Sequence, residues 1–203
     1  MKTVLFLGDG STYAQAAMNW LAGVPDIAVR WDPPQWGEYD LGLGFLHPHK
    51  IPEKELGDGK RWVNFHPAPL PEYRGRNVAY HAIMNGATQF GSTVHYMDKN
   101  FDTGEIIEVC RYPVTSDMTA GDLVHRSREL LVNQFKRLTP ELLKGKLPSK
   151  PQGEGGKYFK QQKIDDEIHL NHDQASLVRA LTVHPDHHAR VVVGGRKYKI
   201  VPE

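Results

Sequence analysis

Three side chains that could transfer an acyl group to an amine lie in two short segments of the chain. Asn64 and His66 stand one residue apart in residues 64–67, and Asp102 follows in the Phe-Asp-Thr-Gly sequence of residues 101–104. A carboxamide can donate a hydrogen bond to a developing oxyanion, an imidazole can take up a proton, and a carboxylate can orient the imidazole. These residue types therefore favour acyl transfer.

An extended conformation up to His66 would place two of these side chains together. Side chains alternate along a strand, so Asn64 and His66 would point to one side and Phe65 into the core. Asp102 lies between two β-rich runs, and loops at strand ends commonly carry the site residues of open α/β sheets. The same segments are also turn signals, because Asn and His stand beside a proline and Asp-Thr-Gly is a common turn sequence. Spacing alone leaves a catalytic cluster and a pair of turns as alternatives.

Alternating strands and helices are expected around these segments. Apolar runs predict strands over 3–7, 27–31, 40–45, 61–65, 92–97 and 105–112, and helical spacing predicts helices over 13–22 and 79–85. Thr119 or Asp122 would begin a long amphipathic helix that reaches about Lys144, with an interruption near Pro140. This order predicts an α/β fold with a Rossmann-like, mostly parallel sheet flanked by helices.

The chain is expected to divide into a main domain and a small extension. Residues 1–147 form the predicted domain, and residues 148–160, rich in Pro, Gly and charge, form a predicted linker. In residues 161–203 we expect a short helix over 175–181 and a β-hairpin. The hairpin would join 190–193 to 196–201 through a two-residue Gly-Gly turn.

Composition and charge restrict the partners. A formal net charge of +1 over 203 residues gives no reason to expect a nucleic-acid partner. Cys110 is the one cysteine, so it cannot form an internal disulfide, and we expect it to be a packing residue in a reducing compartment. No apolar run is long enough to cross a bilayer or to act as a signal segment. We therefore expect a soluble, cytoplasmic protein without a membrane partner.

Histidine content raises the question of a metal site. The chain has 11 histidines, and the spacings of His47 with His49 and of the histidines within 184–188 could ligate zinc. Neither group lies in a Cys/His framework, so we expect no functional metal. Residues 8–11 follow the first strand, where a phosphate loop would lie, but the G-x-G-x-x-G pattern is absent. A dinucleotide site is not expected there.

The wider sequence around the three polar residues resembles a known family. The stretch Asn64–Asn77 reads NFHPAPLPEYRGRN, and Gly91–Asp98 reads GSTVHYMD before FDTGEII at 101–107. Both closely resemble the signature of the 10-formyltetrahydrofolate-dependent formyltransferases, and they are most like the nucleotide-sugar N-formyltransferases. The resemblance is dense from about residue 40 to 113. It implies the formyltransferase fold, and it places Asn64, His66 and Asp102 at the positions of the family's catalytic Asn, His and Asp.

The same resemblance implies two substrates and their contacts. The formyl group of 10-formyltetrahydrofolate, a co-substrate, would move to the primary amine of a nucleotide-linked amino sugar. The folate would lie in a slot lined by Phe45, Leu46, His47, Ile51, Asp98 and Asp102. The acceptor would be contacted by Tyr73, Arg74, Arg76 and Asn77, where a guanidinium can bind a phosphate or sugar hydroxyls. Plain core packing is the alternative for the apolar members, and a solvated turn is the alternative for the acceptor loop.

The roles within the catalytic trio are only partly fixed by residue type. His66 is the candidate base, since an ordinary imidazole titrates near neutral pH, and Asn64 with His66 would stabilise the tetrahedral intermediate. Asp102 would orient His66 or hold a proton-shuttling water, and both alternatives stay open. His95 is a second candidate for a site role, because the resemblance implies a His in this strand, and a hydrogen-bonded structural residue is the favoured alternative.

Other functions remain as alternatives. A glycinamide ribonucleotide or other small-amine formyltransferase is less favoured because Asp9 would repel a phosphate after the first strand. The neutral charge, together with the absence of residues for a further barrel domain, argues against tRNA. A formyltetrahydrofolate hydrolase and a non-catalytic folate-binding module follow in that order. By resemblance to the sugar enzymes, homodimerisation through the tail hairpin or its neighbouring helix is a further expectation.

Overall fold

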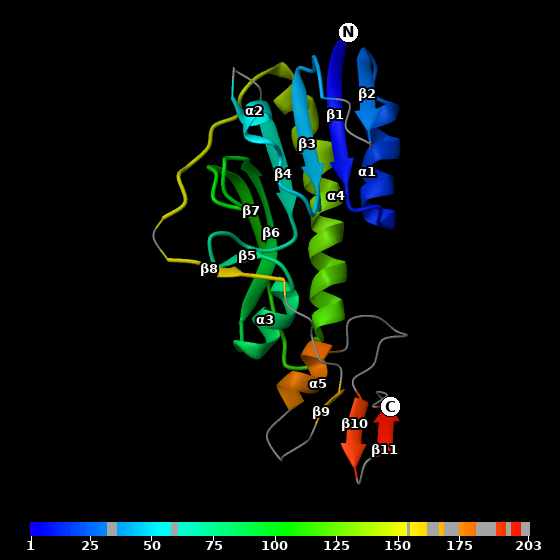
Figure 1. Cartoon of the computed structure of the whole chain (residues 1–203), viewed down its shortest axis with the longest axis vertical. Helices are drawn as coiled ribbons and strands as arrows, with labels where there is room; N and C mark the ends of the chain where they lie inside the picture. Colours follow the sequence, from blue (N-terminus) through cyan, green and yellow to red (C-terminus); the bar gives the residue numbers. More distant parts are fainter. Residues whose placement is uncertain are drawn as a thin grey trace.

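The computed structural model describes residues 1–31, 36–57, 61–153, 155–161, 167–168, 175–181, 190–193 and 196–199. Its centre is a sheet with the strand order β2-β1-β3-β4-β6-β7 (Figure 1). These strands are β1 (Lys2–Gly8), β2 (Ile27–Trp31), β3 (Leu41–Phe45), β4 (Trp62–His66), β6 (Gln89–Tyr96) and β7 (Ile106–Pro113). β1 to β4 pair in parallel, whereas β6 and β7 are antiparallel to their neighbours. The predicted α/β fold with a mostly parallel sheet is confirmed.

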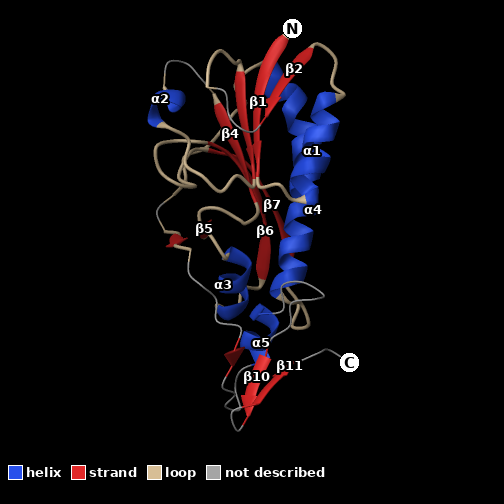
Figure 2. Cartoon of the chain, turned by 45° about the vertical axis from the view of Figure 1, so that its right-hand side comes forward, coloured by secondary structure: helices blue, strands red, loops and turns tan. Residues whose placement is uncertain are grey.

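Two helices cover one face of this sheet (Figure 2). They are α1 (Thr12–Ala22) and α4 (Ala120–Lys144). α4 begins at the predicted place, and Thr119 and Asp122 form a capping box there by bonding to each other's backbone N–H. The expected interruption at Pro140 is wrong, because the helix continues through it to Lys144. Leu138 and Leu142, on either side of the proline, are buried in the core, and this packing favours a continuous helix over a break at Pro140.

Aromatic rings from three strands and α4 form the centre of the core beneath that face. Phe65 is fully buried and lies 4.9 Å, centroid to centroid, from Phe135 of α4. Phe45 stacks on Phe65 at 5.8 Å, and Phe6 stacks on Phe45 at 6.5 Å. Because Phe65 points into this cluster, its neighbours Asn64 and His66 project from the opposite face of β4. The alternation predicted for residues 64–66 is therefore confirmed.

Shorter elements lie beyond the opposite face and at the lower end of the sheet. They are α2 (Glu53–Leu56), β5 (Tyr73–Gly75), α3 (Val78–Met84), β8 (Lys157–Phe159) and α5 (Ala175–Leu181). β8 runs parallel to β5, and Lys150 forms an isolated bridge with Ile106. Phe159 is buried between the rings of Tyr73 and His81. The segment predicted as a linker thus hydrogen-bonds to the main domain at both of these points.

A small sheet follows, with the order β11-β10-β9. β10 (Arg190–Val193) and β11 (Arg196–Lys199) pair antiparallel, as the predicted hairpin requires, and β9 (Glu167–Ile168) adds a parallel strand that the sequence did not indicate. The Gly-Gly turn and the predicted strand end at 200–201 lie outside the described residues. In the part of the chain that the structure describes, no helix is both long and apolar enough to cross a membrane.

Candidate active site

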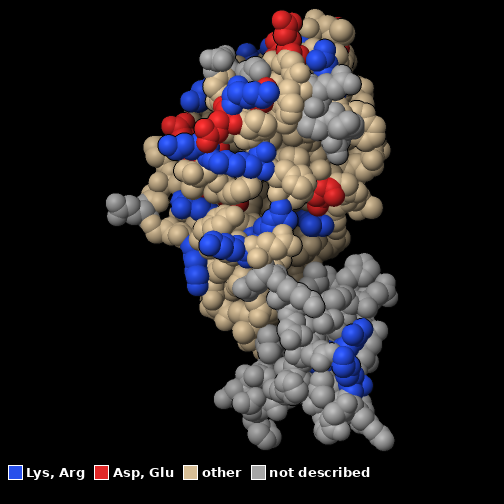
Figure 3. Space-filling model, viewed as in Figure 1, with Lys and Arg blue, Asp and Glu red and all other residues tan. Residues whose placement is uncertain are grey.

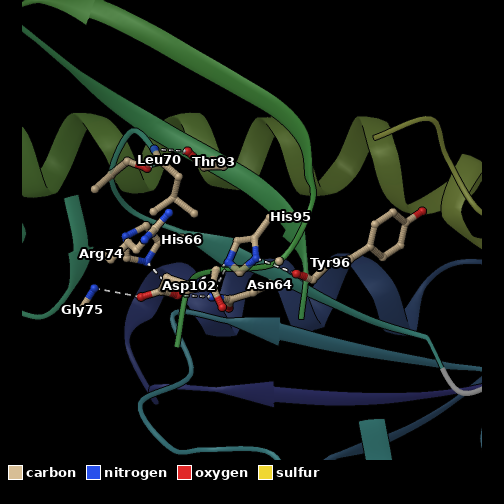
Figure 4. A network of polar contacts seen from close by, with 12 residues as sticks. Asn64, His66, Leu70, Arg74, Gly75, Thr93, His95, Tyr96 and Asp102 are labelled. Atoms are coloured by element: carbon tan, nitrogen blue, oxygen red, sulfur yellow. Dashed lines mark hydrogen bonds and ion pairs between the residues drawn. The ribbon is translucent and has the colours of Figure 1, made fainter. Parts of the chain in front are cut away.

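The structure brings together the three polar residues singled out from the sequence (Figure 4). Asn64 and His66 stand at the end of β4, and Asp102 stands in the loop between β6 and β7. Asn64 Nδ2 lies 3.2 Å from Asp102 Oδ1, and His66 Nδ1 lies 3.5 Å from the same oxygen. The exposed fractions of Asn64, His66 and Asp102 are 9%, 4% and 9%. They form a compact, nearly buried cluster.

The main chain, rather than a carboxylate, fixes the ring of His66. Its Nε2 lies 2.7 Å from the carbonyl oxygen of Tyr73, which can only accept, so Nε2 carries the proton. Nδ1 is left facing Asp102 at 3.5 Å, which is too long for a hydrogen bond. Burial penalises the imidazolium and holds the pKa of His66 below its ordinary value, although Asp102 acts in the opposite direction. A neutral ring with its lone pair on Nδ1 follows, which is the form that a base requires.

Asp102 is held as a carboxylate by donors on both of its oxygens. Burial alone would raise its pKa, but the attraction of the carboxylate to His66 when that ring takes up a second proton, together with His95 and the Gly75 N–H, outweighs burial and holds the pKa of this carboxyl well below its usual range. Gly75 N donates to Oδ2 at 2.9 Å, and Asn64 Nδ2 donates to Oδ1. The backbone of Asp102 is left-handed, with φ of 56°, a conformation that residues other than glycine rarely adopt.

His95, which the sequence offered both as a structural residue and as a second site candidate, lies in the cluster. It lies opposite Asn64 in the β4–β6 register and is 1% exposed. Its Nδ1 lies 2.8 Å from the carbonyl oxygen of Tyr96, so in a neutral ring Nε2 accepts from Asn64 Nδ2 at 3.2 Å. The expected structural hydrogen bond is present, but the ring also lies against the site. Its strand register with Asn64 could have revealed this position.

Both hydrogens of the Asn64 amide nitrogen have an acceptor within the cluster. Nδ2 donates to Asp102 and to His95, while Oδ1 is buried with no partner among the described residues. Exchanging the two amide atoms would direct an oxygen at a carboxylate, so this orientation is the favourable one. Both Nδ2 bonds measure 3.2 Å, at the long end of the normal range, so their hydrogens can be shared with a further acceptor.

The cluster opens into a cleft of about 1640 Å³, more than one small ligand needs. Most of the residues predicted to bind folate or acceptor line it, and they are Leu46, His47, Ile51, Asp98, Asp102, Arg76 and Asn77. Phe45, Tyr73 and Arg74 are not among the lining residues. Phe45 lies in the core, Tyr73 packs against Phe90 and Phe159, and Arg74 donates to Gln152.

Further cleft residues escaped sequence reasoning. Phe101 and Tyr158 stack with centroids 6.4 Å apart at the cleft and are 42% and 45% exposed. An exposed aromatic pair offers a flat face to a planar ligand. Its members lie 57 positions apart, so no local sequence signal joins them. Asp9 also lines the cleft, where Arg128 lies 3.6 Å away and offsets its charge.

Basic side chains are prominent on one face of the molecule. On the face that carries β5 and β8, Lys and Arg side chains cover more of the drawn surface than Asp and Glu (Figure 3). Among the described residues, no group of three or more His, Cys, Asp or Glu side chains could hold a metal ion. The histidines at 184–188, considered from the sequence, lie outside the described residues.

The segment that carries the cluster residues matches a known family in sequence. Residues 57–138, which include Asn64, His66, His95 and Asp102, match the family model described as Formyl transferase. A methionyl-tRNA formyltransferase from Methylacidiphilum infernorum is 33% identical over 140 residues, covering 66% of this chain and 44% of that protein. A GDP-perosamine N-formyltransferase from Brucella melitensis is 34% identical over 120 residues, or 59% of this chain and 43% of that protein. The chain thus spans less than half the length of these curated relatives.

Solved structures share the fold over almost the whole chain. A 4-N formyltransferase from Francisella tularensis has a TM-score of 0.84 at 22% identity. The alignment covers 100% of this chain and 97% of the Francisella tularensis chain. An N-formyltransferase from Helicobacter canadensis, solved in complex with folinic acid and dTDP-3-aminofucose, has a TM-score of 0.74 at 18% identity, with 89% and 80% covered. Residues 57–138 thus belong to the formyltransferase family, and the chain shares its fold with sugar N-formyltransferases of known structure.

Proposed function

We propose that the protein transfers the formyl group of 10-formyltetrahydrofolate to the primary amine of a nucleotide-linked amino sugar. The observation that carries this proposal is the buried cluster of Asn64, His66 and Asp102 at the edge of a cleft large enough for two substrates. The folate and the amino-sugar nucleotide named in the Helicobacter canadensis complex support this pair of substrates. The prominence of Lys and Arg over the face with β5 and β8 suits a diphosphate (Figure 3).

The reaction begins at the acceptor amine. A neutral amine attacks the formyl carbon, and the nitrogen of the resulting intermediate must lose a proton. His66 Nδ1 is the free lone pair beside the cleft, so it takes this proton. The Asp102 carboxylate lies 3.5 Å from Nδ1, so it can accept an N–H of the amine during the attack and favour the imidazolium that follows.

The formyl oxygen becomes negative in the same step. One Asn64 Nδ2 hydrogen, now directed at His95 Nε2, reaches that oxygen as the charge develops. Such a donor contributes about 3 kcal/mol to transition-state stabilisation in comparable sites. Collapse of the intermediate breaks the bond to N10 of the folate, and N10 takes up a proton from His66 or from water. The products are the formamido sugar and tetrahydrofolate, so atoms and charge balance.

We place the folate and the acceptor at different ends of the cleft. Leu46, His47, Ile51 and Asp98 would receive the pterin, which needs an apolar slot with polar groups at its rim. Arg76 and Asn77 would face the acceptor. Arg76 also donates to the carbonyl oxygen of Pro48, so it links the two ends.

The test is mass-spectrometric detection of N-formylated product from 10-formyltetrahydrofolate and a panel of dTDP-, UDP- and GDP-linked amino sugars. Glycinamide ribonucleotide and a sample without acceptor run beside them. A mass gain of one formyl group on a sugar supports the proposal. Formyl transfer only to glycinamide ribonucleotide, release of formate without acceptor, or folate binding without turnover would each contradict it and identify the competing function.

A further inference from the structure

The side chain of Gln152 makes four hydrogen bonds to the two loops that hold the catalytic cluster. Its Nε2 donates to the carbonyl oxygens of Asp102 at 3.0 Å and Gly104 at 2.8 Å. Its Oε1 accepts from Arg74 Nε at 3.1 Å and from Nη2 at 2.8 Å. Every donor and two acceptor positions of the amide are therefore used. Gln152 itself is not among the residues that line the cleft.

The first pair of bonds holds the backbone on which Asp102 stands. Asp102 is left-handed, with φ of 56°, so its peptide needs support from its surroundings. A Cβ at Gly104 would overlap the carbonyl oxygen of Tyr96, because this side of the loop is already in close contact with the backbone of β6. Gln152 binds the loop through its carbonyl oxygens. The position of the Asp102 carboxylate thus depends on a restraint from outside its own loop.

The second pair of bonds reaches β5. Arg74 stands between two residues whose main chains touch the catalytic side chains (Figure 4). The Tyr73 carbonyl accepts from His66 Nε2, and the Gly75 N–H donates to Asp102 Oδ2. β8, which follows Gln152 in the chain, pairs in parallel with the same three residues of β5. One side chain therefore ties the backbone behind Asp102 to the backbone behind His66.

We infer that Gln152 is a positioning residue for formyl transfer, fixing the distance between the Asp102 carboxylate and His66. The inference rests on the proposed function and extends it to a residue outside the cleft. An amide suits this position because it can accept twice from a guanidinium and donate twice to carbonyl oxygens. A carboxylate keeps the first ability and loses the second, and an aliphatic side chain loses both.

Three variants separate these contributions. Gln152→Leu removes all four bonds, Gln152→Glu keeps the Arg74 pair but repels the two carbonyl oxygens, and Arg74→Met leaves the carbonyl bonds intact. We expect kcat to fall about 10- to 100-fold in both Gln152 variants, with the KM for folate unchanged, because a small misplacement of a catalytic group has effects of this size. Arg74→Met should lower kcat less than either Gln152 variant does. Ser149→Ala is the matched control, since it removes a nearby bond to Glu105 that does not touch the site.

A second readout does not depend on activity. The Gly75 N–H is protected by Asp102 Oδ2, so its hydrogen-exchange rate, measured by NMR, reports whether the carboxylate is in place. We expect this rate to rise about tenfold or more in Gln152→Leu and Gln152→Glu, while amides of β1 and β3 keep their wild-type rates. An unchanged Gly75 rate, or a wild-type kcat in Gln152→Glu, would overturn the inference. If the wild-type protein formylates no acceptor, the proposed function fails, and the exchange measurement still decides whether Gln152 positions Asp102.

Discussion

The ring of His66 is fixed by the loop that follows it in the chain, because its Nε2 lies 2.7 Å from the carbonyl oxygen of Tyr73. The other ring nitrogen is left toward Asp102 and the cleft. This arrangement assigns the orienting role to a main-chain group. Residue types left open whether Asp102 orients His66 or holds a water. Because Tyr73 already fixes the ring, we propose that Asp102 bonds to a water or to the acceptor amine.

Removing the imidazole tests the role of His66 as the base. We expect His66→Ala to lower kcat by at least about 100-fold, the usual contribution of a positioned general base, while the Kd for folate changes little. Single-turnover kinetics and fluorescence titration with folinic acid measure the two quantities. Wild-type-like turnover in this variant would contradict the mechanism.

Protein stability should also report the neutral state of His66. Its folded pKa lies below the unfolded value, so below about pH 6.5 the unfolded chain binds the extra proton and stability falls as the pH decreases. One such group contributes a slope of up to about 1.4 kcal/mol per pH unit in that range. Urea unfolding at pH 7.5 and pH 5.5 should therefore show a smaller decline for His66→Gln than for the wild type. Equal declines would mean that His66 is protonated in the folded protein.

Asp102 should matter for turnover more than for folding. Asp102→Asn keeps the shape but removes the charge that accepts from Gly75 and Asn64, and it withdraws the anion facing Nδ1. We expect a loss of about two to four orders of magnitude in kcat, comparable with other triad members. The midpoint of thermal unfolding should shift by only a few degrees. A large loss of that midpoint with a proportionate loss of activity would favour a structural role instead.

Much of the site could be predicted from local sequence. Alternation along β4 places Asn64 and His66 on one face because Phe65 is committed to the core, and the position of Asp102 between two β-rich runs indicated a loop at the strand ends. The orientation of residues 73–77 could not be predicted in this way. A turn rich in Pro and Gly carries no periodicity, and the ring of Tyr73 turns inward because Phe90 and Phe159 offer it an apolar surface.

The contacts of residues 148–161 could not be predicted from local sequence either, because their partners lie far away in the chain. Gln152 meets the carbonyl oxygen of Asp102 across 50 positions, and β8 has only three residues, with a single buried side chain. Composition suggested a linker, whereas pairing with β5 gives the segment its structure. Pro140 provides the opposite example, since local chemistry predicted a break and the burial of neighbouring leucines favoured the helix.

His95 can be tested through its bond to Asn64. His95→Leu leaves a buried Nδ2 hydrogen of Asn64 without its acceptor, which costs about 1–3 kcal/mol and lets the amide turn. We expect kcat to fall at least about tenfold in this variant. His95→Gln should recover part of that loss, since its amide oxygen can accept in place of Nε2. Equal kcat values for the two variants would show that the acceptor at this position does not matter.

Gly42 on β3 tests the packing beneath the site rather than its chemistry. A Cβ at Gly42 would overlap the indole of Trp62, which is buried and donates to the Tyr39 hydroxyl at 2.8 Å. We expect Gly42→Ala to cost about 1–3 kcal/mol, the usual cost of overpacking, and to lower the unfolding midpoint by about 2–4 °C for each kcal/mol. Gly57→Ala is the matched control because nothing lies within 4 Å of its added methyl. Calorimetry of both variants measures the difference. Since neither Gly42 nor Trp62 lines the cleft, Gly42→Ala should bind folate normally below its midpoint. Equal midpoints for the two variants would contradict the close packing of Trp62 on β3.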